Sequence, residues 1–154
     1  MDIGIGTYSG QFRNIFVLNN VFKATIGAKS WGTSVYFSNV ANYKVINNIT
    51  VDCHPEHRKI IGGNGIVDFN LAWNSDGSKP SLSPAPQANE LISISPQFNF
   101  YTASYGENNY HLLKTSPAIN SALTLTDVQF DFDSIARPQG GAYDIGPFEY
   151  HDTK

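Results

Sequence analysis

The densest group of reactive side chains lies at positions 53–59, where Cys-His-Pro-Glu-His-Arg-Lys combines a thiol, two imidazoles and two cations. A lyase needs a general base next to a cation that neutralises the carboxylate of its substrate. The weak candidates for these catalytic roles are His57, Arg58 and Lys59. The same run lacks the second ligand pair that a four-coordinate zinc site requires. With no partner motif elsewhere, we favour an exposed polar loop that follows a strand ending at Val51.

A second group of charged side chains lies near the C-terminal end. Its acids, Asp131, Asp133 and Asp144, are weak candidates for a metal site, and calcium is the cation that carboxylates would bind. Calcium takes about six to eight oxygen ligands. Arg137 lies among these acids in the sequence. We therefore expect a bidentate ion pair between Arg137 and the acids, which holds the end of the fold in place. No cofactor is expected, with calcium as the open alternative.

Two tryptophans are candidates for contact with sugars. Trp31 and Trp73 each lie next to a polar turn, where an aromatic ring would be well placed to stack on a sugar. Packing in an all-β core is the more common role of such large rings, and both interpretations stay open. Polysaccharide is therefore the ligand class that the aromatic residues suggest.

The elements that must position these residues are short strands and tight turns. Only 15% of the 154 residues are charged, and Asn, Ser, Thr, 13 Gly and 8 Pro contribute much of the remaining sequence. Such a composition is typical of an all-β domain. The net charge of -3 offers no basic surface for nucleic acid, and no apolar run reaches the roughly 18 residues of a membrane span. A single cysteine excludes an intrachain disulfide.

An internal repeat indicates how the strands are arranged. Residues 14–20 (NIFVLNN) recur 28 positions later as residues 42–48 (NYKVINN), and a weaker copy at 64–70 (NGIVDFN) begins 22 positions after the second. Repeats of roughly 20 to 50 residues are the signature of solenoids and arrays. Asparagine tolerates the left-handed backbone conformation, so the Asn pairs are predicted to turn corners and to hydrogen-bond along the stack. These structural residues are Asn19, Asn20, Asn47, Asn48 and Asn70.

The second half of the chain carries several motifs in a fixed order. Residues 116–120 read SPAIN, residues 136–138 read ARP, and residues 143–150 read YDIGPFEY. In this order they resemble the ending "SPAID … RP … DIGAYEY" that closes many bacterial pectin-lyase-like proteins, which are right-handed parallel β-helices. Asn120 stands in place of the usual Asp. The resemblance implies that this chain is the C-terminal part of such a protein.

Together these patterns predict an all-β fold, a short right-handed parallel β-helix of about three to four coils with an irregular C-terminal closing segment. The coils occupy residues 1–115 with a long loop near 74–90, the closing segment spans 116–150, and 151–154 form a tail. Propeller blades are disfavoured because they need roughly 40 residues per repeat. The resemblance implies an exported or extracellular parent, but no signal peptide is recognisable, so the compartment is left open.

The expected function follows from what the motifs lack. Polysaccharide lyases of this family carry their bases and calcium-binding acids on central coils, and none of those motifs is matched here, so activity is left open with a non-catalytic role favoured. The first coil has no capping helix, and its apolar end is expected to pair head-to-head with a second copy. We therefore expect a non-catalytic, carbohydrate-associated β-helix module that forms a dimer through its N-terminal coil. The alternatives are a truncated or partner-completed polysaccharide lyase or glycoside hydrolase, and a purely structural oligomerising protein.

Overall fold

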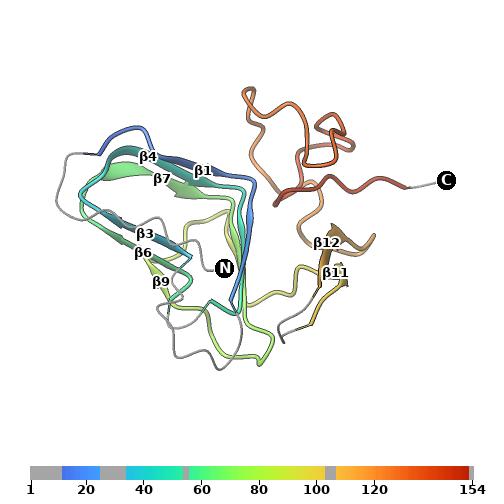
Figure 1. Cartoon of the computed structure of the whole chain (residues 1–154), viewed down its shortest axis with the longest axis horizontal. Coiled ribbons are helices and arrows are strands. Elements are labelled where there is room, and N and C mark those ends of the chain that lie inside the picture. Colours follow the sequence, from blue (N-terminus) through green and yellow to red (C-terminus); the bar gives the residue numbers. More distant parts are fainter. Residues whose placement is uncertain (1–11, 25–33, 54–55, 103–106, 153–154) are drawn as a thin grey trace.

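The computed structural model describes residues 12–24, 34–53, 56–102 and 107–152. Within these ranges the protein contains twelve short strands and no helix, which confirms the all-β class predicted from the composition. Parallel strands form stacked sheets on one side of the molecule, and the irregular C-terminal segment lies beside them (Figure 1). No helix in this part of the chain is long and apolar enough to cross a membrane.

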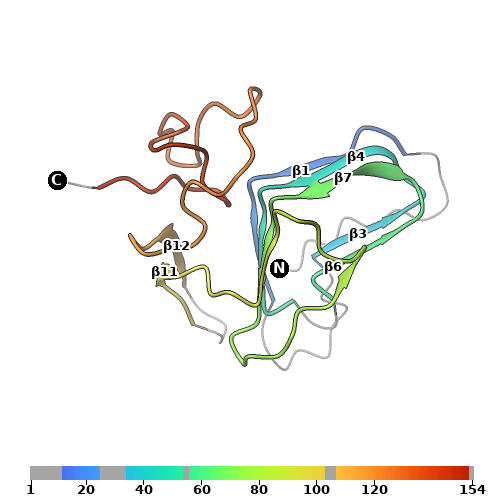
Figure 2. The same ribbon diagram turned by 180° about the vertical axis from the view of Figure 1, so that it is seen from behind.

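Three of the sheets are parallel, and Figure 2 shows strands of the first and of the third from behind. The first contains β1 (Phe16–Leu18), β4 (Ala41–Ile46) and β7 (Asn64–Asp68). The second contains β2 (Val21–Lys23), β5 (Ile49–Val51), β8 (Leu71–Trp73) and β10 (Leu91–Ile92). The third contains β3 (Val35–Ser38), β6 (Arg58–Ile61) and β9 (Leu82–Ser83). A separate antiparallel pair contains β11 (Phe98–Phe100) and β12 (Asn109–Leu112).

Each parallel strand pairs with the strand that occupies the same place in the next copy of the repeat. Phe16 pairs with Lys44 and Leu18 pairs with Ile46, so the 28-residue spacing in the sequence is the spacing between paired strands. Ile46 pairs in turn with Asp68, 22 positions later. The copies of the repeat therefore lie on top of one another, and none of the sheets closes on itself within the described residues.

The corner between the first and second sheets is turned by residues in the left-handed backbone region. Asn19 and Asn47 have φ angles of 53° and 60°, which asparagine adopts at little cost. In the third layer the same corner is occupied by Phe69, with a φ of 55°. A large side chain is strained in this region, so the third copy of the repeat departs from the favoured residue type at its corner.

A ladder of amide side chains runs along the stack next to this corner. Asn20 Nδ2 donates to Asn48 Oδ1 at 3.2 Å, and Asn48 Nδ2 donates to Asn70 Oδ1 at 3.1 Å. The ladder ends on Glu90, whose carboxylate accepts from Asn70 Nδ2 at 2.9 Å and from Arg58 at 2.6 Å. A carboxylate accepts the last amide hydrogen, and the guanidinium neutralises its charge inside the fold.

Hydrophobic side chains form two clusters, one on each face of the second sheet. The inner cluster lies among the three parallel sheets and contains Val17, Val35, Phe37, Val40, Tyr43, Val45, Ile60 and Val67. In the outer cluster, Ile49, Val51 and Leu71 pack with Ala118 and Ile145 of the C-terminal segment. Side chains alternate between the faces of a strand, and because both faces are covered, every residue of β5 is buried. The C-terminal segment thus covers the outer face of the second sheet.

Hydrogen bonds attach the C-terminal segment to the corner of the second layer. Gly146 N donates to Asn47 O at 2.9 Å, and Leu123 N donates to Asn47 Oδ1 at 2.9 Å. Gly146 has a φ of 106°, and a Cβ atom at this position would lie 2.7 Å from Ile49 Cδ1. Glycine is therefore required both by the backbone angle and by the close approach of the two segments.

The stretch 74–90, predicted to be a long loop, contains a short strand. Strand β9 lies within it and pairs with β6, with Leu82 opposite Arg58. Near its other end, Asn89 Nδ2 donates to Asp68 Oδ2 at 2.8 Å. The strand is only two residues long and its composition is aperiodic, so no alternation in the sequence could reveal it.

Candidate binding cleft

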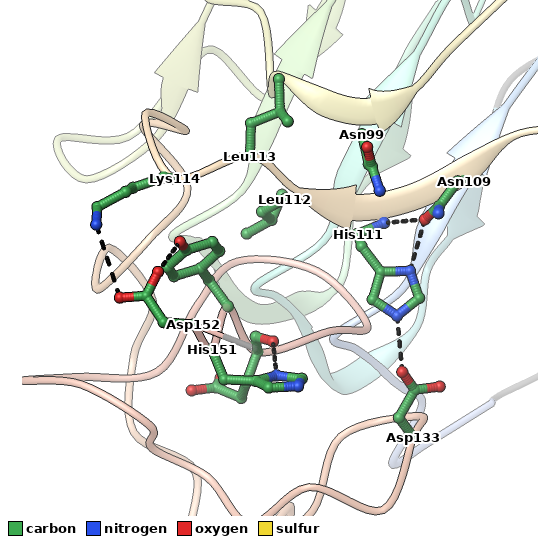
Figure 3. Close-up of a pocket in the computed structure, with 11 residues that line it drawn as sticks. Asn99, Asn109, His111, Leu112, Leu113, Lys114, Asp133, His151 and Asp152 are labelled. Atoms are coloured by element: carbon green, nitrogen blue, oxygen red, sulfur yellow. Dashed lines mark hydrogen bonds and ion pairs between the residues drawn. The ribbon is translucent and has the colours of Figure 1, made fainter. Parts of the chain in front are cut away.

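A cleft of about 620 Å³ opens between the β11–β12 sheet and the C-terminal segment (Figure 3). A volume of this size lies in the range of small-molecule sites, roughly 300–1,000 Å³. Polar side chains gather at both ends of the cleft, and Leu112 lies between them. The polar lining residues are Asn99, Asn109, His111, Lys114, Asp133, Glu149, Tyr150, His151 and Asp152.

One end of the cleft holds an imidazole between two oxygen atoms. His111 Nδ1 lies 2.6 Å from Asn109 Oδ1, and His111 Nε2 lies 2.7 Å from Asp133 Oδ2. Alternation along β12 places Asn109 and His111 on the same face, whereas Tyr110 packs against the hydrophobic cluster behind the strand. Each ring nitrogen therefore faces an acceptor oxygen and donates to it when it carries a hydrogen.

Asp131 shapes the loop that presents Asp133. Its Oδ1 accepts from the backbone N–H groups of Asp133 and Ile135 at 2.9 and 2.8 Å, and its Oδ2 accepts from Glu149 N at 2.9 Å. Because these bonds use both of its carboxylate oxygens, Asp131 has a structural role in the loop that carries Asp133. Asp133 is the acid of this loop that reaches the cleft.

Aromatic rings form the rim next to the imidazole. The ring of Phe148 stacks on His111, with 4.0 Å between centroids and 23° between planes. Phe132 contacts Phe148 edge-on, at 5.8 Å and 84°. The side chain of Phe132 is otherwise open to solvent, with 81% of its surface exposed. The rim therefore combines a fixed stack with one uncovered ring.

The other end of the cleft carries Lys114, Tyr150 and Asp152. The Tyr150 hydroxyl donates to Asp152 Oδ1 at 2.5 Å, and Lys114 Nζ lies 3.7 Å from Asp152 Oδ2. The tyrosine hydrogen bond, assisted by the charge of Lys114, lowers the pKa of Asp152 from its ordinary value. The same hydrogen bond raises the pKa of Tyr150. This end of the cleft therefore keeps a negative charge next to a positive one.

A buried ion pair includes Glu149, one of the residues that line the cleft. Arg137 Nη1 lies 2.6 Å from Glu149 Oε1, and the two side chains are 1% and 0% exposed. Arg137 also donates to the backbone oxygens of Asp144 and Gly146 at 3.1 and 2.8 Å. Arg137 therefore links the parts of the closing segment, but the expectation of an aspartate partner is wrong, because Glu149 supplies the carboxylate.

The carboxylate of Asp144 binds the backbone and makes no direct ion pair with the guanidinium. It accepts from Asn120 N at 2.7 Å and from Tyr150 N at 2.6 Å. The residue is buried, and this desolvation raises the pKa of Asp144 from 3.8 to about 6. Asp144 therefore fixes the turn that leads into the cleft rather than lining it.

The catalytic candidates His57, Arg58 and Lys59 lie at β6, and none of them lines this cleft. His57 is 1% exposed, with its ring nitrogens 2.9 Å from Thr50 Oγ1 and 2.7 Å from Asn74 Oδ1. Both ring nitrogens therefore have polar partners within the fold. In this arrangement the imidazole connects the inner face of the second sheet to the turn after β8.

The exposed loop expected for 53–59 is wrong for its last residues, because His57 and Arg58 are buried and strand β6 begins at Arg58. Arg58 is 3% exposed and pairs with the Glu90 carboxylate that ends the amide ladder. Lys59 is partly exposed, and its Nζ lies 3.3 Å from Glu56 Oε2. Alternation along β6 turns Arg58 inward and Lys59 outward, so the two cations do not converge on one site.

Trp31, one of the two stacking candidates, lies outside the described residues. Trp73 is half-buried and packs against the outer hydrophobic cluster. Its ring meets Tyr101 edge-on, with 5.6 Å between centroids. Trp73 therefore contributes to the core, and part of its ring remains open to solvent.

The three acids proposed as metal ligands point to different partners. Asp131 and Asp144 accept backbone N–H groups, whereas Asp133 faces His111. Among the residues that the structure describes, there is no group of three or more His, Cys, Asp or Glu side chains that could hold a metal ion. The calcium alternative stays a prediction.

Sequence reasoning did not select most of the cleft residues. His111, Lys114 and Asp152 were not candidates, and Asn99 was not singled out. One signal was present in the alternation of polar and apolar residues along Asn109–Leu112, which places Asn and His on one face of a strand. That pattern does not indicate which segment lies opposite, so it could not identify a cleft.

Comparison with known proteins does not assign the chain to a family. No family model matches it, no curated protein matches it, and no solved structure matches it. The geometry of the cleft is therefore the basis for a functional proposal.

Proposed function

We propose that the protein is a non-catalytic carbohydrate-binding module built on a short right-handed parallel β-helix. The β-helix is supported by the three parallel sheets, in which each strand pairs with the equivalent strand of the next copy of the repeat. The amide ladder at a shared corner supports it as well, because stacked identical side chains are typical of solenoids. The order of the closing motifs, which resembles that of pectin-lyase-like proteins, gives independent support.

The unused hydrogen-bonding groups at the His111 end of the cleft carry the carbohydrate proposal. Asn99 is exposed, and its amide has no hydrogen-bond partner in the described part of the chain. Asn109 uses its carbonyl oxygen for His111, which leaves its amide hydrogens free within the same part. Asp133 uses Oδ2 for His111, and its Oδ1 remains for a ligand.

These groups match the chemistry of sugar hydroxyls. A hydroxyl group both donates and accepts, so neighbouring hydroxyls on a sugar ring can be bound by an amide donor and a carboxylate acceptor together. Asn99 and Asn109 supply the donors, and Asp133 supplies the acceptor. The stacked rings of His111 and Phe148 add an apolar surface beside them. The cleft therefore combines the two kinds of contact that a sugar offers.

A polysaccharide lyase or glycoside hydrolase is the second candidate, and the His111–Asp133 pair favours it. An imidazole paired with a carboxylate is a common acid–base group, and a ring that donates from both nitrogens has the form of a general acid. Lys114 at the other end of the cleft is a cation that could neutralise the carboxylate of a uronate. This candidate uses the same cleft and differs only in whether the bound glycan is cleaved.

Affinity measurements with cleft variants test the binding proposal. A glycan array identifies ligands of the wild type, and calorimetry then compares Asp133→Ala and Asn99→Ala with it. Each variant loses hydrogen bonds worth about 1–2 kcal/mol, so affinity should fall about tenfold. Asp127→Ala, an exposed acid outside the cleft, is the matched control and should bind as the wild type does. A wild type that binds no glycan on the array contradicts the proposal.

Product analysis separates the two candidates. Each bound glycan is incubated with the protein, and an absorbance assay detects unsaturated products while a reducing-end assay detects hydrolysis. We expect binding without product. Product that disappears in His111→Ala would establish an enzyme in place of the module.

We also propose that the module self-associates through the first strands of its parallel sheets. In the described residues β1, β2 and β3 each have a hydrogen-bonded neighbour on one side only. Such edges present unpaired N–H and C=O groups that a second copy can bind. Sedimentation velocity at micromolar concentration should show a dimer, and a clean monomer would refute this part of the proposal.

A further inference from the structure

Phe132 is the most exposed large hydrophobic side chain in the described part of the chain, at 81%. It directly precedes Asp133, the carboxylate that lines the cleft. Its ring contacts Phe148 edge-on, and Phe148 in turn stacks on His111. An uncovered aromatic ring that contacts a cleft residue through one intervening ring is more typical of a binding surface than of a folded core.

The backbone around Phe132 is held on both sides. Phe132 N donates to Pro147 O at 2.9 Å. On either side of it, Asp131 accepts from the N–H groups of Asp133 and Glu149, both at 2.9 Å. The ring therefore stands in a defined place before any ligand arrives, which reduces the entropy lost on binding.

We propose that Phe132 forms a second subsite beside the cleft, and that the ligand is a neutral oligosaccharide. One sugar unit lies in the cleft against Asn99, Asn109 and Asp133, and the next unit stacks its C–H face on the Phe132 ring. This inference rests on the proposed function, which it extends from a sugar to a chain of sugars.

The charges around the two subsites favour a neutral ligand. Asp133 lines the cleft and directly follows Phe132 in the chain, so it is the charged residue next to both subsites. Asp152 lies at the far end of the cleft. Lys114 is already paired with Asp152, and the chain as a whole has a net charge of -3. A uronate chain would place further carboxylates next to Asp133, whereas the lysine of the cleft lies at the other end, beside Asp152.

Binding of oligosaccharides of defined length tests the second subsite. The probes are cellohexaose, xylohexaose and chitohexaose, their monosaccharides, and hexagalacturonate as the acidic comparison. Phe132→Ala should weaken binding of the preferred hexasaccharide about tenfold, as expected for the loss of an aromatic contact face. Monosaccharide binding, followed by NMR titration, should stay unchanged. Phe132→Trp should retain or increase hexasaccharide affinity because a larger ring occupies the same place.

Phe130→Ala is the matched control, because Phe130 is 60% exposed on the same segment but, among the described residues, lacks the ring contact with Phe148 that links Phe132 to His111. It should bind the hexasaccharide as the wild type does. Equal affinities of the wild type and Phe132→Ala, with Asp133→Ala still weakened, would overturn the Phe132 subsite and leave the proposed function intact. A wild type that binds none of the sugars would overturn both. Tighter binding of hexagalacturonate than of the neutral hexasaccharides would overturn the neutral ligand class.

Discussion

Replacing Asn48 by alanine tests whether the amide ladder stabilises the stacked sheets. The Asn48 side chain is buried, at 1% exposure. Its Oδ1 accepts from the backbone N–H and the amide of Asn20 at 3.0 and 3.2 Å. Its Nδ2 donates to Val17 O at 2.8 Å, to Ile46 O at 3.1 Å and to Asn70 Oδ1 at 3.1 Å. Alanine removes all of these contacts between three layers of the stack.

The expected loss follows from the number of hydrogens and acceptors that Asn48 contributes. Its amide supplies two hydrogens and one acceptor oxygen, so about three net hydrogen bonds disappear, each worth about 1 kcal/mol. The free energy of unfolding should therefore fall by about 3 kcal/mol, and the melting temperature by roughly 6–12 °C for a domain of this size. Asn48 has no positive φ, so alanine adds no change in backbone strain.

Urea denaturation followed by circular dichroism measures the loss. Asn20→Ala is the matched control, because Asn20 belongs to the same ladder but is exposed, and water replaces its lost hydrogen bonds. It should cost no more than about 1 kcal/mol. If Asn48→Ala and Asn20→Ala reduce the free energy of unfolding equally, the buried ladder does not stabilise the stack and the reasoning is refuted.

Three further predictions concern the corners and the closing segment. Gly146→Ala should destabilise the protein by about 3 kcal/mol, because its Cβ would lie 2.7 Å from Ile49 Cδ1 at a φ of 106°. Gly77→Ala, at a φ of 78° with open space around its Cβ, should cost only about 1 kcal/mol, and equal losses in urea would argue against the close packing. Phe69→Asn should stabilise by about 1 kcal/mol, since asparagine tolerates the φ of 55° at this corner; a lower urea midpoint would contradict this. Burial raises the pKa of Asp144 from 3.8 to about 6, so the folded protein holds this proton more tightly than the unfolded chain does. The stability contributed by protonated Asp144 is present below about pH 4 and is lost as the pH rises through about 6. Asp144→Asn removes this titration but also one of the two acceptor oxygens, so the stability difference between variant and wild type should shift in favour of the variant by up to about 3 kcal/mol as the pH rises across this window, and a pH-independent difference in melting temperature would refute the assignment.

Several features of the fold were predictable because they repeat along the chain. The copies at 14–20, 42–48 and 64–70 predicted strands stacked at a fixed spacing, and the 28-residue and 22-residue offsets are the offsets between paired strands. The Asn pairs predicted corners, since few residue types accept the left-handed angles found at Asn19 and Asn47. Both inferences depend only on local conformation and on self-similarity, which a sequence displays directly.

The partners of charged residues were less predictable. Arg137 was expected to pair with an aspartate, but the backbone N–H groups of Asn120 and Tyr150 occupy Asp144, and Glu149 takes the guanidinium. Among the cations at β6, alternation buried Arg58 against Glu90. Composition indicates which groups can pair, whereas competition from the surrounding backbone decides which of them do.

The sequence by itself determined the all-β class, the parallel stacking of the repeats and the residues at their corners, because periodicity and backbone preference act over short stretches of chain. Only the tertiary structure decided where the cleft lies. His111 comes from β12 and Asp133 from a loop more than twenty positions later, and they meet because the C-terminal segment docks on the outer face of the second sheet through Gly146 and Asn47. A contact of this kind depends on how two surfaces fit together, and that fit exists only once both have folded.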